Sequence, residues 1–286
     1  MPIDVNLFDA NFTYTLNDCG YITSTKDYKP NKINWIPQNL QFTGDITVFT
    51  DRFVSRSNLE LIRSCKSKYK VAWLVEPASI YPFIYEEIKH MIDEFDLILT
   101  HHIEVLLLSK KCHWVHGCGS WINKDNWKVI EKTKKVCIIA SNKNYAPGHM
   151  LRHEVIKKYG DQIDVFGRGY RPFPDKQDIL KDYMFSIEIE NCRKENYFTE
   201  KLLDCLALGT IPIYWGPKFG IKKFFDLNGF IQFDNIDDIR NILPSLDNQL
   251  YMQKQSSINF NLNNAKIFAS LDDYVADILT SKLLNA

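Results

Sequence analysis

Short apolar runs rich in β-branched residues alternate along most of this chain with amphipathic stretches of about a dozen residues. This rhythm is typical of βαβ units, in which helices join parallel strands and cover both faces of the sheet. In the first half of the chain it predicts five strands and three helices. The expected strands span residues 3–8, 45–50, 70–75, 96–100 and 113–115, and the helices lie near 58–66, 84–94 and 103–109.

A polar and charged stretch at residues 123–135 interrupts the rhythm, and a second α/β unit follows it. We therefore predict two domains, 1–130 and 131–286, and leave open whether the last helix packs back on the first. The predicted fold class is α/β, with two Rossmann-like parallel-sheet domains facing a central cleft. In the second unit the expected strands span 136–140, 163–166, 184–189, 211–214 and 230–233, and the helices 149–159, 177–182, 199–208, 221–226, 236–246 and 271–283.

The composition excludes several classes of protein. With 45% hydrophobic and 24% charged residues, the chain has the composition of a globular protein and not of a disordered one. Lys plus Arg equals Asp plus Glu at 35 each, so no global field draws the chain to nucleic acid or to an anionic membrane. The aromatic residues are not interleaved with a basic stripe, which also argues against a nucleic-acid partner.

The amino terminus and the cysteines bear on location. The first residues lack the basic and apolar regions of a secretory signal, and no apolar run approaches the ~18 residues of a membrane span. The seven cysteines are scattered and include no C-x-x-C pair, which suits a reducing compartment. We therefore expect a cytoplasmic protein without a transmembrane segment, and the sequence does not predict its oligomeric state.

The stretch from residue 185 to 203 carries the densest polar chemistry of the chain. Thr199 is placed to cap a helix, and Glu200 lies in its first turn, where a carboxylate complements the helix dipole. An ordinary capped helix accounts for both residues. Alternatively, the helix N–H groups and the ammonium of Lys201 bind a diphosphate, while Glu200 accepts hydrogen bonds from the vicinal hydroxyls of a ribose. On that hypothesis one helix start holds both parts of a nucleotide.

The same stretch resembles a known family. The segments FSIEIEN (185–191), YFTEK (197–201) and GTIPIYWG (209–216) are similar in order and spacing to the signature of the family 10 glycosyltransferases, the α1,3/α1,4-fucosyltransferases. The resemblance covers roughly residues 136–235. It implies a GT-B architecture with an acceptor-side domain at 1–130 and a donor domain at 131–286. It also implies inverting transfer of fucose from GDP-fucose without a metal.

Carried over position by position, the resemblance implies donor-binding roles. Glu200 resembles the family's ribose-binding carboxylate, and Lys201 and Arg152 resemble the two cations on the diphosphate. Tyr197 matches an aromatic residue beside the nucleotide. The strand-end pair Glu190–Asn191 matches residues near the donor. A surface arginine on a helix is the alternative for Arg152.

Further residues would support the donor site. Ser141 and Asn142 lie in a segment similar to one that precedes the family signature, and Arg168 ends a predicted strand in a glycine-flanked loop. A structural role accounts for Arg168 equally well. The sequence contains no D-x-D motif, the usual metal-chelating motif of metal-dependent sugar transferases. We therefore expect no metal and no cofactor besides the donor substrate.

Inverting transfer needs a carboxylate that takes the proton of the acceptor hydroxyl as the new bond forms. Glu76 follows the predicted strand 70–75 and precedes Pro77, so it lies at the carboxyl end of a first-domain strand. Family members carry their proposed base in a comparable segment, and Glu76 is the candidate here. An ordinary strand-end glutamate is the alternative.

Three functions remain open from the sequence. The first is an inverting, metal-independent fucosyltransferase that acts on a hydroxyl of an oligosaccharide or glycoconjugate acceptor. The second keeps the fold but uses another nucleotide sugar, because Glu188 and Ile189 depart from the family pattern. The third is a nucleotide-sugar or glycan-binding protein without turnover. The identity of the acceptor is not predicted.

Overall fold

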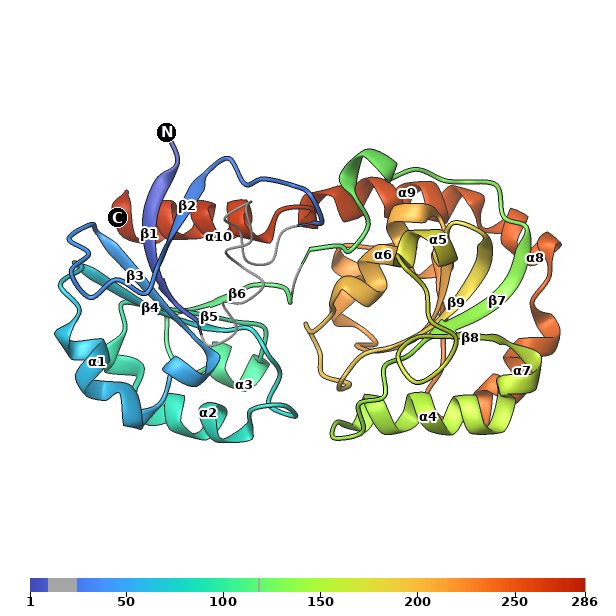
Figure 1. The fold of residues 1–286 in the computed structure, drawn as a ribbon, viewed down its shortest axis with the longest axis horizontal. Coiled ribbons are helices and arrows are strands. Elements are labelled where there is room, and N and C mark those ends of the chain that lie inside the picture. The colour runs from blue at the N-terminus through green and yellow to red at the C-terminus, as the bar shows by residue number, and fades with distance from the viewer. Residues whose placement is uncertain (10–24, 118, 286) are drawn as a thin grey trace. The chain divides into compact units, whose positions relative to one another are not determined.

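The computed structural model describes residues 1–9, 25–117 and 119–285. The chain forms two compact units, one made of residues 1–118 and 270–286 and the other of residues 119–269. Each unit contains a parallel β-sheet with helices packed on it (Figure 1), so the predicted α/β fold class with two parallel-sheet domains is confirmed. The prediction placed the boundary near residue 130, whereas in the structure the chain enters the second unit at Gly119 and leaves it after Ala269.

Contacts of the polar stretch explain why it belongs to the second unit. Lys132 is not a solvated linker residue: its ammonium donates to the carbonyls of Leu180, Lys181 and Leu208 and to the hydroxyl of Thr210, at 2.8–3.2 Å. The last carbonyl groups of a helix lack hydrogen-bond donors within the helix, and a lysine ammonium can donate to them. The side chain of Lys132 therefore anchors this charged run to the second unit, although the run resembles a linker in sequence.

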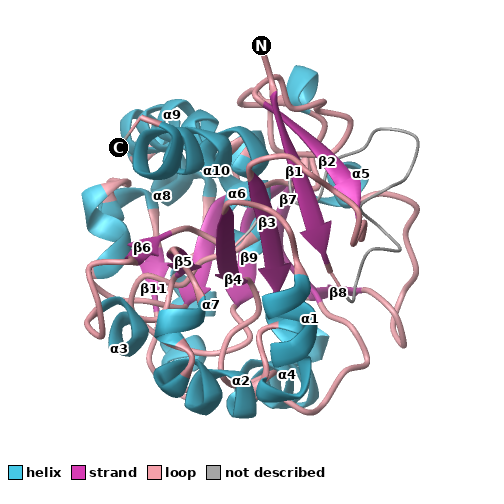
Figure 2. Ribbon diagram, turned by 90° about the vertical axis from the view of Figure 1, so that its left-hand side faces the viewer, coloured by secondary structure: helices cyan, strands magenta, loops and turns pink. Residues whose placement is uncertain are grey.

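The first sheet has six parallel strands in the order β2-β1-β3-β4-β5-β6, which Figure 2 shows side by side. The five predicted strands are all present, and β2, which was not predicted, is added at one edge. Ile33 and Trp35 of β2 point into the core. The strands are β1 (Ile3–Phe8), β2 (Ile33–Pro37), β3 (Ile46–Thr50), β4 (Tyr69–Leu74), β5 (Leu97–Thr100) and β6 (Cys112–Trp114).

Helices cover both faces of this sheet. Val71 and Trp73 of β4 pack in a core with helix α10 (Leu271–Leu279), and the intervening Ala72 and Leu74 pack in the opposite core. Alternate residues of a strand point to opposite faces, so a strand buried on both sides reads as one apolar run. The opposite face carries the short helices α1 (Leu59–Ser64), α2 (Pro82–Glu87) and α3 (Ile103–Leu106).

Helix α10 is held on the first sheet by polar contacts as well as by its apolar face (Figure 1). The indole of Trp35 donates to Asp272 at 2.7 Å in a buried position. Asp273 accepts the backbone N–H groups of Asn31 and Lys32, both at 2.8 Å. These bonds join the end of the chain to the edge strand β2, and segment 270–286 thereby becomes part of the first unit.

The second sheet has five parallel strands in the order β11-β10-β9-β7-β8. Its strands are β7 (Lys134–Ile139), β8 (Asp164–Phe166), β9 (Tyr183–Ile189), β10 (Ile211–Trp215) and β11 (Ile231–Gln232). Its helices are α4 (Pro147–Tyr159), α5 (Lys176–Leu180), α6 (Glu200–Leu208), α7 (Asp238–Ser245), α8 (Asn248–Gln253) and α9 (Gln255–Ala265). The predicted helix 221–226 is a short 3-10 turn at Gly220–Lys223, and α8 and α9 occupy an Asn- and Gln-rich stretch for which no helix was predicted.

The central strand β9 separates an apolar layer from a polar one. Phe185, Ile187 and Ile189 belong to the main core of the second unit, together with residues of α4 and α7. On the alternate face, the buried Ser186 and Glu188 precede Glu190, and contacts from this face reach residues 199–205. This polar row places charged groups under helix α6.

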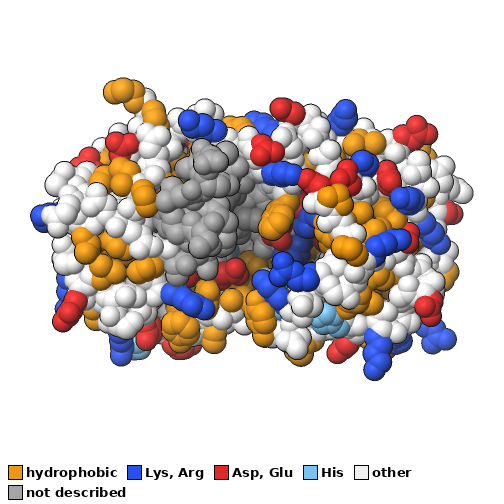
Figure 3. Space-filling view, in the orientation of Figure 1, with side chains coloured by type: hydrophobic (Ala, Val, Ile, Leu, Met, Phe, Trp, Pro, Cys, Tyr) orange, Lys and Arg blue, Asp and Glu red, His pale blue; other side chains and the backbone are white. Residues whose placement is uncertain are grey.

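The surface of the described residues mixes both signs of charge. On the face that Figure 3 shows, Lys and Arg side chains are interspersed with Asp and Glu over both units. This distribution accords with equal numbers of basic and acidic residues in the chain. Within the described ranges, no helix has the length and apolar character needed to cross a membrane.

Candidate nucleotide-sugar site

The start of helix α6 is fixed by a buried carboxylate. Glu190, which directly follows β9, is fully buried and accepts hydrogen bonds from the backbone N–H and the hydroxyl of Thr199, at 3.0 and 2.7 Å. The hydroxyl of Tyr214 also donates to Glu190, at 3.1 Å. Thr199 has extended dihedral angles and caps the helix by accepting the N–H of Lys201. Glu190 therefore sets where α6 begins and how its first turn is oriented.

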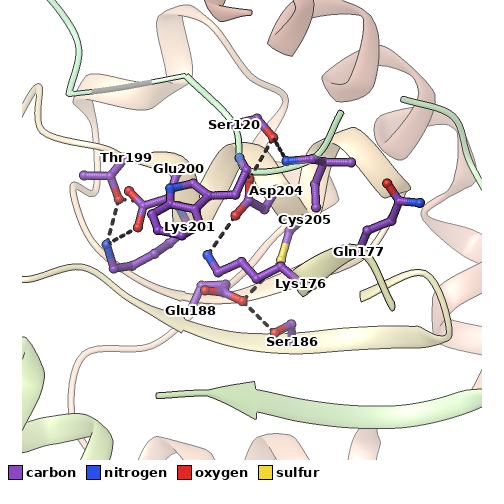
Figure 4. Close-up of polar contacts among 12 residues, drawn as sticks. Ser120, Lys176, Gln177, Ser186, Glu188, Thr199, Glu200, Lys201, Asp204 and Cys205 are labelled. Carbon is purple, nitrogen blue, oxygen red and sulfur yellow. Dashed lines mark hydrogen bonds and ion pairs between the residues drawn. The ribbon is translucent and has the colours of Figure 1, made fainter. Parts of the chain in front are cut away.

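Glu200 and Lys201 lie side by side in that first turn (Figure 4). The ammonium of Lys201 donates to Glu200 at 2.9 Å and to the hydroxyl of Thr199 at 3.0 Å, and it lies 3.7 Å from Glu190. Burial opposes the charge of Lys201, but Glu200 and Glu190 outweigh it and raise the pKa of the lysine. Both side chains keep a small exposed fraction, 18% for Glu200 and 16% for Lys201. The pair is thus a charged, nearly buried element at a helix amino terminus.

Arg152 of α4 forms hydrogen bonds with residues at the end of β9. Its guanidinium donates through Nε to the carbonyl of Ile189 at 2.9 Å, and its Nη2 donates to that carbonyl and to the side-chain oxygen of Asn191, the latter at 3.1 Å. The residue is 6% exposed, and burial lowers its pKa. Two of the predicted donor-binding residues, Arg152 and Asn191, are therefore in direct contact.

Helix α4 approaches β9 closely because of a glycine. A Cβ on Gly148 would lie 1.7 Å from the carbonyl oxygen of Glu190 and 3.1 Å from the Cα of Asn191. The N–H of Gly148 instead donates to the carbonyl of Asn191 at 3.0 Å. The first turn of α4 and the end of β9 are therefore packed backbone against backbone, which places Arg152 one turn further along.

A buried ion pair supports α6 from below its first turn. Lys176, the first residue of α5, donates to Asp204 at 2.7 Å, and Figure 4 shows the two side chains pointing at each other. Asp204 also accepts the hydroxyl of Ser120 and the N–H of Trp121, both at 2.7 Å. Burial opposes the charge of Lys176, but Asp204 and then Glu200 outweigh it and raise the lysine's pKa. Asp204 thus ties α6 to the first residues of the second unit.

Glu188 lies on the same polar row and has an unusual protonation equilibrium. It accepts the hydroxyl of Ser186 at 2.6 Å and the thiol of Cys205 at 3.4 Å. Burial raises the pKa of Glu188 to about 7, although Lys176 and the bond from Ser186 act in the opposite direction. A carboxyl in such a place is partly neutral near neutral pH.

The remaining predicted donor-site residues differ in exposure. Tyr197 is 2% exposed and lies in the loop before α6. Ser141 and Asn142 follow β7, and Asn142 is exposed. Arg168 is exposed after β8, between Gly167 and Gly169, which both have positive φ angles.

Glu76 lies in the first unit, two residues beyond the end of β4. Its N–H donates to Asp51 at 3.2 Å, and its carbonyl accepts the hydroxyl of Tyr85 at 2.6 Å. Asp51, which directly follows β3, is 4% exposed and also accepts the N–H of Val75 at 2.8 Å. Burial, and then the charge of Glu76, raise the pKa of Asp51 well above its usual value.

Comparison with known families gives a specific match for the second unit. Residues 129–260 match the model of the C-terminal domain of glycosyltransferase family 10 (fucosyltransferase). The match covers a little less than half of the chain. The matched range contains Arg152, Glu190, Glu200 and Lys201. The predicted family resemblance is therefore confirmed.

Curated relatives are named as fucosyltransferases or as similar to them, and they match this chain over part of their length. A fucosyltransferase-like protein of Arabidopsis thaliana is 29% identical over 130 residues, which cover 43% of this chain and 25% of that protein. An alpha-(1,3)-fucosyltransferase of Helicobacter pylori is 33% identical over 78 residues, 27% of this chain and 16% of that protein. The matches thus span a quarter or less of these two relatives.

Solved structures share the fold over nearly the whole chain. An alpha1,3-fucosyltransferase superposes with a TM-score of 0.57 over 99% of this chain and 89% of that one, at 15% identity. An alpha-glucosyltransferase in complex with UDP and DNA superposes with a TM-score of 0.58 over 100% of both chains, at 12% identity. The architecture is GT-B, as predicted.

Three polar groups of the structure were not singled out in the sequence. Asp51 and Asp204 were missed because each is one carboxylate among many, although Asp51 directly follows a correctly predicted strand. His149 of the family 10 domain was missed too, although it lies three residues before Arg152 and therefore on the same face of a helix. A search for polar residues at strand ends finds Asp51, but no local pattern distinguishes Asp204.

Proposed function

We propose that this chain is an inverting, metal-independent fucosyltransferase that moves fucose from GDP-fucose to a hydroxyl of a glycan acceptor. The observation that carries the proposal is the start of α6, where the Glu190–Thr199 contact positions Glu200 and Lys201 inside a family 10 domain. A solved alpha1,3-fucosyltransferase that shares the fold contains GDP-fucose, which supports the choice of donor for the test.

The donor-binding half of the site would work through charge and geometry. Lys201 and Arg152 would stabilise the diphosphate, whose negative charge grows as the bond to the sugar breaks. Glu200 would accept the ribose hydroxyls, with Tyr197, Ser141, Asn142 and Arg168 as further candidates around the nucleotide. Glu190 is fully buried and its oxygens are occupied, so we assign it the positioning of Thr199 and not contact with the donor.

The acceptor-binding half would supply the base. Glu76 would take the proton of the attacking hydroxyl as that oxygen bonds to the anomeric carbon and GDP leaves, which inverts the configuration. The cations on the leaving diphosphate would perform the role that a divalent ion has in other sugar transferases. Names of relatives such as the mouse 4-galactosyl-N-acetylglucosaminide 3-alpha-L-fucosyltransferase 9 suggest N-acetylglucosamine-containing saccharides as first acceptors to screen.

The decisive experiment is calorimetric titration of the purified protein with GDP, UDP, CDP and ADP, with EDTA present throughout. The proposal predicts selective binding of GDP. Lys201→Met should weaken GDP binding by about tenfold to a hundredfold, because a charged hydrogen bond is worth about 1.5–3 kcal/mol. The exposed Lys157 at the far end of α4 provides the control variant Lys157→Met, which should bind as the wild type does.

The same titration separates the alternatives. Preference for UDP would support a glycosyltransferase that uses another nucleotide sugar, and binding only after a divalent ion is added would contradict metal independence. If GDP binds, incubation with GDP-fucose and a saccharide panel, followed by NMR of the new anomeric centre, tests transfer and inversion. GDP binding without transfer to any acceptor would favour a binding protein.

A further inference from the structure

His149 is a buried histidine at the third position of helix α4. It is 3% exposed, and its Nδ1 accepts the backbone N–H of Ala146 at 3.2 Å. The ring also makes an edge contact with Tyr145, with 4.7 Å between ring centroids. Because Nδ1 is an acceptor, the proton of the neutral imidazole lies on Nε2. Within the described residues, this Nε2–H has no hydrogen-bond acceptor.

The charged groups around His149 are mostly cationic. Burial lowers the pKa of His149 to about 4, and the next causes, in order, are Arg152, Lys143, Lys201 and His153. Arg152 and His153 belong to α4 itself, Lys143 lies before it, and Lys201 comes from α6. No carboxylate is among these leading influences. The Nε2–H itself is not enclosed, so a ligand can reach this donor, and the cations around it favour an anion.

We propose that His149 is a further donor-binding residue, whose Nε2–H donates to a phosphate oxygen of the nucleotide diphosphate. The proposal rests on the proposed function and adds a contact to it. Two observations of different kind carry it. One is an N–H donor without an acceptor on a nearly buried residue, and the other is the packing of the first turn of α4 on Glu190 and Asn191, which Lys201 and Arg152 contact. A neutral imidazole suits this place because it adds a hydrogen bond without adding another positive charge.

The experiment uses the full chain with His149→Leu, which removes the donor, and His149→Gln, which keeps an N–H donor but cannot titrate. At pH 7.5, calorimetry with GDP should show about tenfold to a hundredfold weaker binding by the Leu variant and less than that by the Gln variant. Binding of guanosine, which has no phosphate, should be the same in all three proteins. Lys157→Gln, on the exposed end of the same helix, is the control.

Each outcome is decisive. Equal GDP affinity of wild type and His149→Leu would overturn the role of His149 and leave the donor proposal intact. Failure of wild type to bind GDP at all would overturn the donor proposal and this contact with it. If thermal unfolding shows that His149→Leu does not fold, His149→Phe, which keeps an aromatic ring beside Tyr145 and removes both ring nitrogens, takes its place in the GDP titration.

Discussion

The two sheets share a parallel topology but differ in the charges at their carboxyl ends. In the first unit, Asp51 and Glu76 follow neighbouring strands, and burial keeps the nearby His101 neutral by lowering its pKa to about 3, with His102 as the second cause. In the second unit, the strand-end carboxylate Glu190 is covered by Thr199, and the cations Arg152 and Lys201 stand beside it.

This contrast accords with the two roles that the proposed mechanism needs. A base needs a carboxylate, and a leaving diphosphate needs fixed positive charge. Glu76 and Glu190 both come just after a central strand, yet Glu190 is fully buried and fully bonded, whereas Glu76 is only partly buried. Strand-end position alone therefore does not assign a role to a carboxylate, because burial and hydrogen-bond partners decide it.

The largest effect is expected at Glu76. Glu76→Gln keeps the size of the side chain and removes the base, so kcat should fall by about 100- to 10,000-fold. GDP affinity should stay within a factor of two of the wild-type value, because the substitution lies in the other unit. Single-turnover transfer from GDP-fucose measures the rate, and calorimetry measures the affinity. Unchanged turnover would show that the contrast between the two sheet edges does not place the base at Glu76.

The next effect concerns stability in the second unit. Asp204→Ala leaves the ammonium of Lys176 buried without its partner and removes the acceptor of Ser120 and Trp121. Breaking a buried pair costs about 3–5 kcal/mol of unfolding free energy. Urea unfolding measures this loss, and the double variant Lys176→Met/Asp204→Leu, which removes both charges, should recover a large part of it. If Asp204→Ala unfolds like wild type, the ion pair does not support α6.

Residues 183–216 show how far the sequence predicts this molecule. The sequence located β9, α6 and β10 to within one residue. The spacing of their apolar residues marks these elements locally, and Thr199 and Gly209 mark the two ends of α6. Glu190 and Lys201, both predicted to bind the donor, lie 3.7 Å apart because their separation along the chain is short, and their role in donor binding stays a prediction.

The features that the sequence did not predict depend on contacts between segments that are distant along the chain. The bond from Ser120 to Asp204 spans 84 residues, and the carbonyl cluster around Lys132 joins the ends of two helices and a strand start. Neither leaves a periodic trace in the sequence. The edge strand β2 was missed because its burial depends on α10, which packs on it from the other end of the chain.

A smaller effect tests the role of Glu190 as a positioning residue. Glu190→Gln places an amide nitrogen opposite one of the donors of Thr199, so the cap of α6 should weaken by about 1–3 kcal/mol of unfolding free energy. GDP affinity should fall together with stability, in contrast to Glu76→Gln. Urea unfolding and GDP calorimetry on the same preparation measure both. Loss of turnover with stability and GDP affinity intact would show that Glu190 acts directly in the reaction.

The last effect is the pH dependence that Glu188 adds to the stability of the second unit. Its pKa is about 7 in the folded protein against 4.5 for an ordinary glutamate, so between these values the folded state binds more protons than the unfolded state. The contribution of Glu188 is therefore fully present below about pH 4.5 and is lost as the pH rises through about 7.

Glu188→Gln keeps the side chain neutral at every pH and should remove this slope. The measurement is the urea midpoint of wild type and variant between pH 4.5 and 8, and the difference between the two curves isolates Glu188 from other groups. The variant should gain stability relative to wild type as the pH rises, because wild type must then bury a charge beside Ser186 and Cys205. Parallel curves would mean that Lys176 compensates the carboxylate fully, in which case the polar row under α6 carries a second ion pair.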